Sequence, residues 1–324
     1  MACSRHAAAC ACPPRLRFLQ FLQFLRFPVG EPAQVAELSD LKAFVDKYEK
    51  LFALTGAGCS TDSGIPDYRD AGGLWKRPPP MDFRSFMDYP LRRARYWARS
   101  MVGWRRFSAA RPNAAHFGLA ELERRGRVAL LATQNVDGLH QAAGSLHVID
   151  LHGRLDRVRC MECGLLRPRG ELQRELEDLN PQWCNLEAAD APDGDAELEG
   201  LDFSSYAVPP CPRCGGIVKP DVVFFGENVP RTRVEATLAG LRQADAVLVV
   251  GSSLMVYSGY RYIKAAAQDG LPIAALNLGR TRADGLLSLK VEQPCAAALA
   301  WLTASGAVPP DAAAASDAAA LSRS

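Results

Sequence analysis

The sequence predicts an α/β protein with a Rossmann-like, doubly wound parallel sheet, and two alternating patterns support this fold class. Short apolar runs, which suit strands buried on both faces, stand at residues 51–55, 128–133, 246–250 and 272–278. Amphipathic stretches of helical period fall between them, at residues 113–125, 231–243 and 259–269. Strands that alternate with helices in this way predict βαβ units and therefore a parallel sheet.

The composition of the 324-residue chain is that of an ordinary globular protein. Hydrophobic residues make up 48% and charged residues 23%, which is enough apolar surface for a sizeable core. A formal net charge of +2 is too balanced to indicate binding to the phosphates of nucleic acids. No apolar run approaches the roughly 18 residues that a membrane-spanning helix needs. We therefore expect neither nucleic-acid binding nor a membrane anchor.

Two segments interrupt the alternation and indicate the domain organisation. Residues 74–111 are arginine-rich and predict a helical module, whereas residues 160–217 hold two cysteine pairs and an acidic stretch. We therefore expect a Rossmann-like domain at residues 34–159 and 218–303, with a helical insertion at about 74–111 and a second inserted module at 160–217.

The two ends of the chain differ from the rest in composition. Residues 1–33 carry arginines and no acid before Glu31, and residues 304–324 are rich in small and polar residues. We expect a flexible extension and a disordered tail. The extension is interpreted as bacterial, which favours the cytoplasm, and the alternative is a transit peptide to the mitochondrial matrix.

Four of the ten cysteines form two C-x-x-C pairs, Cys160/Cys163 and Cys211/Cys214. Paired thiolates on two such knuckles give tetrahedral sulfur ligation of Zn²⁺, a closed structural site with no open position for catalysis. The alternative, two redox pairs, needs a thioredoxin-like context that the sequence lacks. The pattern predicts one structural zinc ion and makes residues 160–217 a zinc-binding module.

The first apolar run leads directly into Gly56-Ala57-Gly58-Cys59-Ser60. Glycines here allow a tight turn and a close approach of backbone N–H groups to a pyrophosphate, and the N-terminus of a following helix would add a favourable dipole. Thr61 stands where the usual dinucleotide fingerprint has its third glycine, so a plain strand-to-helix turn is the alternative.

The next segment, residues 63–75, is broken by glycines and a proline. It predicts an ordered but mobile loop that could fold over a ligand. Arg69 in this loop is expected to contact a phosphate or ribose of that ligand, and an arginine exposed on a surface loop is the alternative.

Polar side chains follow the second apolar run, in Gln134-Asn135-Val136-Asp137. Asn135 and Asp137 could hydrogen-bond a carboxamide, or Asp137 could simply cap the next helix. His152 follows a further short run at residues 148–151 and precedes Gly153, which gives an open approach. A histidine at such a place suits a general base, because its ordinary pKa lies near neutrality; a structural histidine is the alternative.

Two later strands end in the same manner, with Gly251-Ser252-Ser253-Leu254 and Asn277-Leu278-Gly279. Residues 218–227 could form an extended wall to which a peptide adds as a strand, or an ordinary core strand. Because the carboxyl ends of parallel strands lie along one edge of a sheet, these strand ends predict a single ligand crevice.

Together the motifs resemble the sirtuins, NAD⁺-dependent protein-lysine deacylases. The resemblance covers residues 40–303 and is carried in order by GAGCSTDSGIPDYR at 56–69, TQNVD at 133–137, HG at 152–153, the cysteine pairs, KPDVVFFGE at 219–227, GSSL at 251–254 and NLG at 277–279. Residues 56–75 and 95–104 look most like class II, the branch with the mitochondrial lipoamidase-type sirtuin and its bacterial relatives.

The resemblance implies NAD⁺ as co-substrate, acylated-lysine proteins as substrates, and nicotinamide, free lysine and O-acyl-ADP-ribose as products. It implies that His152 is the general base and that Asn135 and Asp137 hold the nicotinamide end. The cofactor-binding residues that it implies are Gly56, Ala57, Gly58, Ser60, Asp67, Tyr68, Arg69, Gln134, Asn135, Val136, Asp137, Gly251, Ser252, Ser253, Asn277, Leu278, Gly279 and Cys295.

Tyr96 and Arg99 stand one helical turn apart in a Y-x-x-R spacing that resembles the acidic-acyl readers of some class II members. A solvated helix face is the alternative. Three other functions are considered: a protein ADP-ribosyltransferase, a lipoamidase-type deacylase, and a non-catalytic NAD or ADP-ribose sensor. The sensor is disfavoured because His152 stands together with Asn135 and Asp137.

Overall fold

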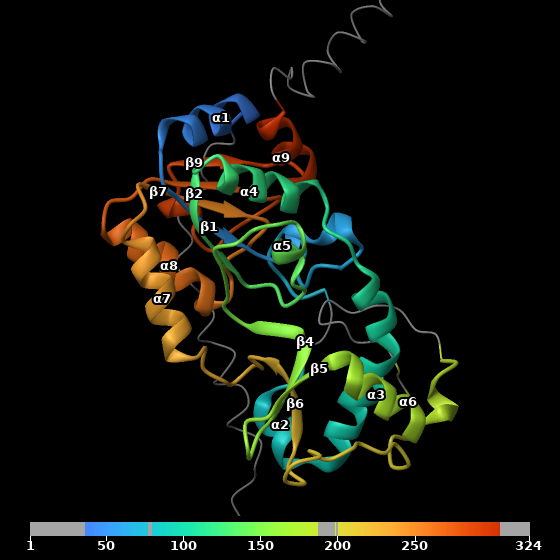
Figure 1. Cartoon of the computed structure of the whole chain (residues 1–324). Coiled ribbons are helices and arrows are strands. Elements are labelled where there is room, and N and C mark those ends of the chain that lie inside the picture. Colours follow the sequence, from blue (N-terminus) through green and yellow to red (C-terminus); the bar gives the residue numbers. More distant parts are fainter. Residues whose placement is uncertain (1–35, 77–79, 187–197, 199, 305–324) are drawn as a thin grey trace, which may run out of the picture.

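The computed structural model describes residues 36–76, 80–186, 198 and 200–304. Its backbone forms a six-stranded parallel sheet and a separate three-stranded antiparallel sheet. In Figure 1 the large sheet and its helices occupy the upper part of the molecule, and the small sheet lies below with its own helices. The extension predicted at 1–33 and the tail at 304–324 lie outside the described residues, apart from Ala304.

The large sheet has the strand order β3-β2-β1-β7-β8-β9, and every neighbouring pair is parallel. Its strands are β1 (Leu51–Thr55), β2 (Val128–Thr133), β3 (Val148–Asp150), β7 (Ala246–Val250), β8 (Ile273–Leu276) and β9 (Leu289–Val291). The four apolar runs that predicted strands are confirmed as β1, β2, β7 and β8. The strand order reverses between β1 and β7, which is where doubly wound sheets bind ligands.

Helices cover both faces of this sheet, and β1 shows why. Leu51 and Ala53 pack into one core, whereas Phe52 and Leu54 pack into the other, because successive side chains of a strand point to opposite faces. The first core is completed by α1 (Leu38–Lys47), α4 (Ala114–Arg124) and α9 (Cys295–Thr303), the second by α7 (Arg231–Leu241) and α8 (Tyr257–Gln268). The doubly wound prediction is confirmed (Figure 1).

The small sheet has the order β5-β4-β6, with β4 (Gly153–Cys160), β5 (Leu166–Pro168) and β6 (Val218–Val222). It packs with α2 (Phe83–Asp88), α3 (Pro90–Ala109) and α6 (Arg169–Leu179) around one aromatic-rich core. Members of this core come from both interrupting segments, among them Phe86, Trp97 and Trp183. Two segments far apart in the sequence therefore build one unit.

The helical prediction for residues 74–111 is only partly right. The first helix begins at Phe83, where Asp82 accepts a hydrogen bond from the Ser85 backbone N–H at 2.9 Å and caps it. It ends at Asp88, because Pro90 excludes Tyr89 from helical geometry and then starts α3 as its first residue. Residues 74–76 are not helical.

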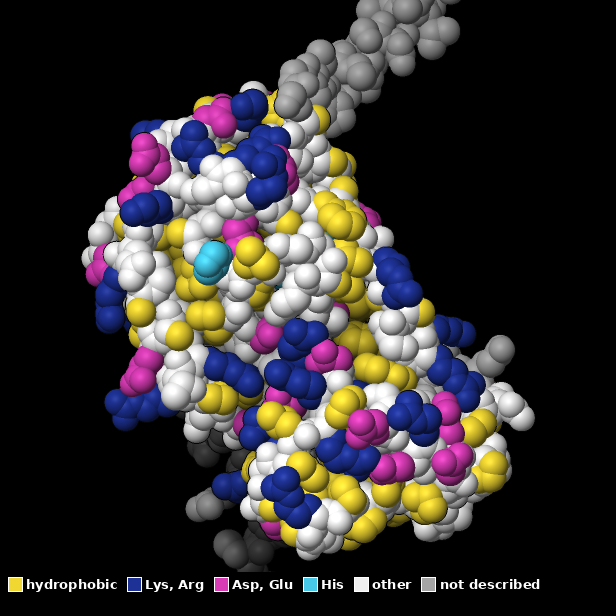
Figure 2. Space-filling view, in the orientation of Figure 1, with side chains coloured by type: hydrophobic (Ala, Val, Ile, Leu, Met, Phe, Trp, Pro, Cys, Tyr) yellow, Lys and Arg dark blue, Asp and Glu magenta, His cyan; other side chains and the backbone are white. Residues whose placement is uncertain are grey.

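The remaining elements are short: α5 (Leu139–Ala142) and the 3₁₀ turns η2 (Ala57–Cys59), η3 (Thr61–Ser63), η4 (Pro181–Trp183) and η5 (Asp284–Leu286). Within the described residues, the helices all fall short of the length and apolarity that crossing a membrane requires. Figure 2 shows basic and acidic side chains interspersed over the visible face, as the balanced net charge predicts.

Candidate active site

A pocket of about 880 Å³ opens at the carboxyl ends of β1, β2, β7 and β8. This volume lies within the range of small-molecule and cofactor pockets, about 300 to 1,000 Å³. Residues of the small unit, including Tyr96, Leu155 and Phe224, complete the lining. Of the predicted cofactor-binding residues, all except Gly279 line this pocket, and so does His152. The predicted crevice therefore exists as one cavity.

The glycine turn is held tightly against the end of β7. The Gly58 backbone N–H donates to the Gly251 carbonyl at 2.8 Å, and a Cβ on Gly56 would lie 2.8 Å from the Ser252 Cβ. A side chain at Gly56 would therefore collide with β7's end. As the glycines and the proline of residues 63–75 predict, no ordinary helix follows the turn: the chain continues as η2 and η3 and then as an irregular loop. The turn itself therefore lacks the dipole of a long α-helix.

The following loop lines the pocket and is ordered by its own contacts. Arg69 donates to the Gly73 carbonyl at 2.8 Å and stacks over the Trp75 ring, with 4.0 Å between the guanidinium carbon and the ring centroid. Asp67 forms an ion pair with Lys76. Gly279 lies behind this loop, since a Cβ there would meet the Ala71 carbonyl oxygen at 2.4 Å. It allows the close approach of the loop rather than contacting the pocket.

A hydrogen-bond network joins the glycine turn to the end of β2. Ser60 Oγ donates to Asp137 Oδ2 at 2.7 Å, and Asn135 Nδ2 donates to Ser60 Oγ at 3.0 Å and to the Gly56 carbonyl at 3.1 Å. Burial raises the pKa of Asp137. Asp137 also accepts from the Leu139 backbone N–H at 2.9 Å, at the start of α5. It therefore both caps a helix and lines the pocket.

His152 makes one hydrogen bond with each ring nitrogen. Its Nδ1 lies 2.8 Å from the Gln134 carbonyl oxygen, and its Nε2 lies 2.7 Å from Ser258 Oγ. Because a carbonyl can only accept, Nδ1 carries the proton and Nε2 keeps its lone pair. Burial lowers the pKa of His152, which favours this neutral form at pH 7. The arrangement therefore presents an unprotonated Nε2 that can act as a base. Its present partner, Ser258, had no signal in the sequence.

Two further histidines contact the glycine turn and the end of β1. His140 Nε2 is 2.9 Å from Thr55 Oγ1, and His116 Nε2 is 3.4 Å from Ser60 Oγ. Burial lowers the pKa of His116 to about 4 and that of His140 to about 3, so both are neutral at pH 7. The signal that could have found His116 is Asn113 three residues earlier, because the two form the capping box of α4.

The other strand ends complete the lining. Gln134 Nε2 donates to Ser252 Oγ at 2.6 Å, and Asn277 Nδ2 donates to the Leu278 carbonyl at 2.9 Å. Cys295 lines the pocket at the start of α9. Of the pair predicted to read the acyl group, Tyr96 is among the lining residues, whereas the half-buried Arg99 is not.

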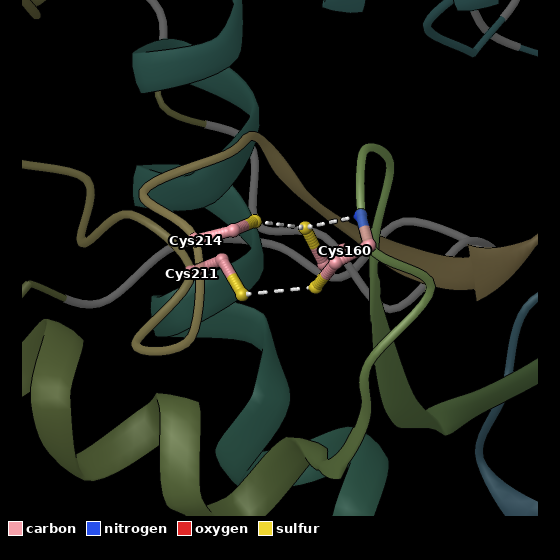
Figure 3. A group of neighbouring side chains, drawn as sticks. Cys160, Cys211 and Cys214 are labelled. Atoms are coloured by element: carbon pink, nitrogen blue, oxygen red, sulfur yellow. Dashed lines mark hydrogen bonds between the residues drawn. The ribbon is translucent and has the colours of Figure 1, made fainter.

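The four predicted zinc ligands form one cluster between β4 and β6 (Figure 3). The sulfur atoms of Cys160 and Cys214 are 3.5 Å apart, and those of Cys163 and Cys211 are 3.7 Å apart. Tetrahedral zinc with Zn–S bonds of about 2.3 Å needs S–S separations of about 3.8 Å, whereas a disulfide needs about 2.0 Å. The spacing therefore fits a structural zinc ion and excludes disulfides between these sulfur atoms.

Comparison with known proteins agrees with this geometry. Residues 56–258 match the Sir2 family. The chain belongs to that family. Its bacterial relatives include an NAD-dependent protein deacetylase of Bordetella bronchiseptica, 66% identical over 268 residues that cover 83% of this chain and 98% of the relative. Another, from Xanthomonas campestris pv. campestris, is 67% identical over 262 residues, or 81% and 89% of the two chains.

Solved Sir2 structures share the fold. A Sir2 protein with a p53 peptide and NAD⁺ superimposes with a TM-score of 0.63 at 29% identity, covering 81% of this chain and 95% of that one. A Sir2 protein bound to an acetylated peptide gives 0.62 at 28% identity, covering 81% and 94%. The sheet with the four-cysteine unit is thus the Sir2 fold.

Proposed function

We infer that the chain is an NAD-dependent protein deacetylase, the activity named for its bacterial relatives, and we propose how its pocket performs the reaction. Products are nicotinamide, free lysine and O-acyl-ADP-ribose. The single observation that carries the proposal is a neutral His152, with its Nε2 lone pair in the same pocket as the glycine turn and Asp137. We also propose the domain division given above, with residues 160–217 as the zinc module.

NAD⁺, when bound, supplies the electrophilic ribose carbon that accepts the acyl oxygen. The glycine turn is positioned to hold its pyrophosphate, because Gly56 and Gly58 line the pocket and carry no side chain that would keep a phosphate from the backbone. Ser252, Ser253 and Asn277 would hold the adenosine ribose, and Cys295 would lie by the adenine. Asn135 and Asp137 would hold the nicotinamide end, since the Ser60 network fixes both side chains.

His152 acts as the general base on a ribose hydroxyl. The Gln134 carbonyl keeps the proton on Nδ1, so Nε2 is the atom that accepts the substrate proton. In the structure Nε2 is hydrogen-bonded to Ser258, and the ribose hydroxyl would replace this partner. Proton transfer of this kind contributes about 10²- to 10⁴-fold in rate.

The acylated lysine would enter between the loops of the two units. Residues 222–229, which follow and include the end of β6, line the pocket with backbone and apolar side chains. Such a segment can accept a peptide as an added strand, which is the role expected of it from the sequence. Phe224 and Leu155 would surround the apolar part of the lysine side chain.

The test is the His152→Ala variant. We expect the rate of deacetylation of an acetyl-lysine peptide to fall by about 10²- to 10⁴-fold. The unfolding curve of the variant should show the same cooperative transition as that of the wild type. Liquid chromatography of peptide and nicotinamide after incubation with NAD⁺ measures the reaction, and thermal unfolding checks the fold. Turnover near that of the wild type would exclude His152 as the base.

Two finer assignments belong to the same proposal. The resemblance of residues 56–75 and 95–104 supports class II, and a lipoamidase-type deacylase is an alternative activity. The bacterial relatives support a cytoplasmic location. ADP-ribosyl transfer is the alternative: ADP-ribose on a protein without acyl-lysine in the assay would support it.

A further inference from the structure

The first turn of α8 brings two polar side chains to the pocket beside the catalytic base. Ser258 and Arg261 are three residues apart and therefore lie on one face of the helix. Both line the pocket, and Ser258 is hydrogen-bonded to His152 Nε2 at 2.7 Å. Arg261 is thus positioned at the end of the pocket where the base acts, and no role is assigned to it above.

Arg261 differs from the other cationic side chains of the lining. Arg69 donates to the Gly73 carbonyl and stacks over Trp75, and Lys76 is ion-paired with Asp67. Across the described part of the chain, no carboxylate forms an ion pair with Arg261. Its Nε is buried without a hydrogen-bond partner, and its guanidinium carbon lies 5.3 Å from the centroid of the Tyr257 ring. An aromatic ring supports a cation but leaves its N–H donors unused.

A buried donor without an acceptor is costly, so a residue of this kind indicates a partner that arrives with a ligand. The planar edge of a guanidinium offers two parallel N–H groups, which match the two oxygens of a carboxylate. The phosphates of the dinucleotide are assigned above to Gly56–Ser60, which follows β1. Arg261 lies beside His152 instead, and its charge contributes to the lowered pKa of that histidine.

We propose that Arg261 binds a carboxylate carried by the acyl group of the lysine substrate. The proposal rests on the deacylase function proposed above and specifies its substrate class: acyl groups with a terminal acid, such as succinyl or glutaryl. The carboxylate would form a bidentate pair with the Arg261 edge and satisfy Nε. It thereby assigns to α8 the selectivity that the sequence suggested for Arg99 on α3.

The test compares acetyl-, succinyl- and glutaryl-lysine in one peptide with saturating NAD⁺. For the wild type and for Arg261→Met, Arg99→Met and Lys264→Met, kcat/KM is measured with each acyl group. Lys264 is an exposed cation one turn further along α8 and is the matched control. We expect the ratio of glutaryl to acetyl turnover to fall about 10- to 100-fold in Arg261→Met only.

A fourth peptide, with acetyl-lysine flanked by glutamate, distinguishes the source of the carboxylate. A preference for this peptide that disappears in Arg261→Met would overturn the placement on the acyl group. An unchanged ratio in Arg261→Met, or a fall in Arg99→Met alone, would also overturn the proposal. Arg261→Lys, which keeps the charge and loses the fork, is expected to recover only part of the ratio if the other variant is unstable. Absence of turnover with every acyl group would instead refute the deacylase function.

Discussion

Three buried histidines surround the glycine turn, and burial keeps all of them neutral. The pKa values of His116, His140 and His152 are lowered because the charged imidazolium would lose its hydration. Of the three, only His152 lines the pocket, and its Nε2 lone pair accepts a hydrogen bond from Ser258 that a substrate hydroxyl can replace. The same physical effect therefore gives two structural residues and one base, and position relative to the cavity decides between them.

These histidines should make the protein acid-sensitive. In the unfolded chain a histidine binds a proton below its ordinary pKa of 6.5, whereas folded His116 and His140 bind one only near pH 4 and 3. Between pH 6.5 and about 4 the unfolded state holds more protons, so the free energy of unfolding falls as the pH falls. Each residue contributes up to about 1.4 kcal/mol per pH unit.

Urea unfolding at pH 7 and pH 5 measures this dependence. His140→Gln keeps a donor near Thr55 and should reduce the loss between the two pH values, whereas His147→Gln should not, because His147 is 68% exposed. Equal losses in wild type and His140→Gln would contradict the explanation.

The sequence predicted the chemistry of single residues only where the motif itself carried it. His152, Asn135 and Asp137 follow apolar runs, so their place at strand ends could be inferred. Ser258 and His140 could not be found in this way, because their partners are 106 and 85 residues distant along the chain. Such contacts depend on the packing of helices, which local patterns do not specify.

At the scale of elements, β6 connects the zinc cluster to residues 222–229, the segment that would accept the peptide. Lys219 of β6 is 5% exposed and forms an ion pair with Glu227 at 2.9 Å. Glu227 in turn accepts from the Phe224 backbone N–H at 2.7 Å, and Lys219 donates to the Val222 carbonyl. The segment that would accept the peptide is therefore held in place by the ion pair between the buried Lys219 and Glu227.

Lys219→Met should damage both stability and peptide binding. The cost in stability stays below about 3 to 5 kcal/mol, the value for a fully buried ion pair, because the Glu227 side chain that remains is 20% exposed. We expect the KM for peptide to rise more than the KM for NAD⁺. Lys42→Met, in an exposed pair, is the control, and an identical effect of the two variants would argue against this role.

Metal removal is expected to act on the small sheet. The two knuckles join the end of β4 to the segment before β6, so without the ion these ends lose their link. A chelator should release one zinc ion per chain and abolish deacetylation, and added Zn²⁺ should restore it. Cys184→Ser, outside the cluster, should behave as the wild type, whereas Cys160→Ser should not bind the metal. Full activity in the zinc-free protein would contradict a structural role.

Strands β1, β2, β7 and β8 could be predicted because apolar runs specify them locally, whereas the three-residue β9 was not predicted. The loop predicted at residues 63–75 could also be inferred locally, because Gly64 at φ +82° and Pro66 end regular structure there. The core that the two inserted segments at residues 83–109 and 160–217 share could not be predicted, because no pattern in either segment identifies the other.

For the whole molecule, the reversal of strand order between β1 and β7 places the pocket, and Gly251 is a point where the end of β7 closely approaches the glycine turn. Gly251 has φ +61°, and a Cβ there would lie 2.3 Å from the Cys59 backbone nitrogen. The end of β7 and the glycine turn can meet only because this side chain is absent.

Binding of NAD⁺ should therefore stabilise the wild type and not Gly251→Ala. At 100 times the Kd, a ligand adds about 2.7 kcal/mol to the free energy of unfolding. Gly270→Ala is the control: Gly270 has φ +73° and open space around it, so it bears the same backbone strain without the collision. Thermal unfolding with and without NAD⁺ checks this, and an equal shift in both variants would contradict it.

The pairing of β1 with β7 also has a consequence for synthesis on the ribosome. Leu51 pairs with Ala246, so the central strand gains its second neighbour only after nearly two hundred further residues have been made. All four cysteine ligands have been translated by then. A nascent chain can therefore bind its metal while one edge of β1 is still unpaired, and β7 to β9 join the sheet only afterwards.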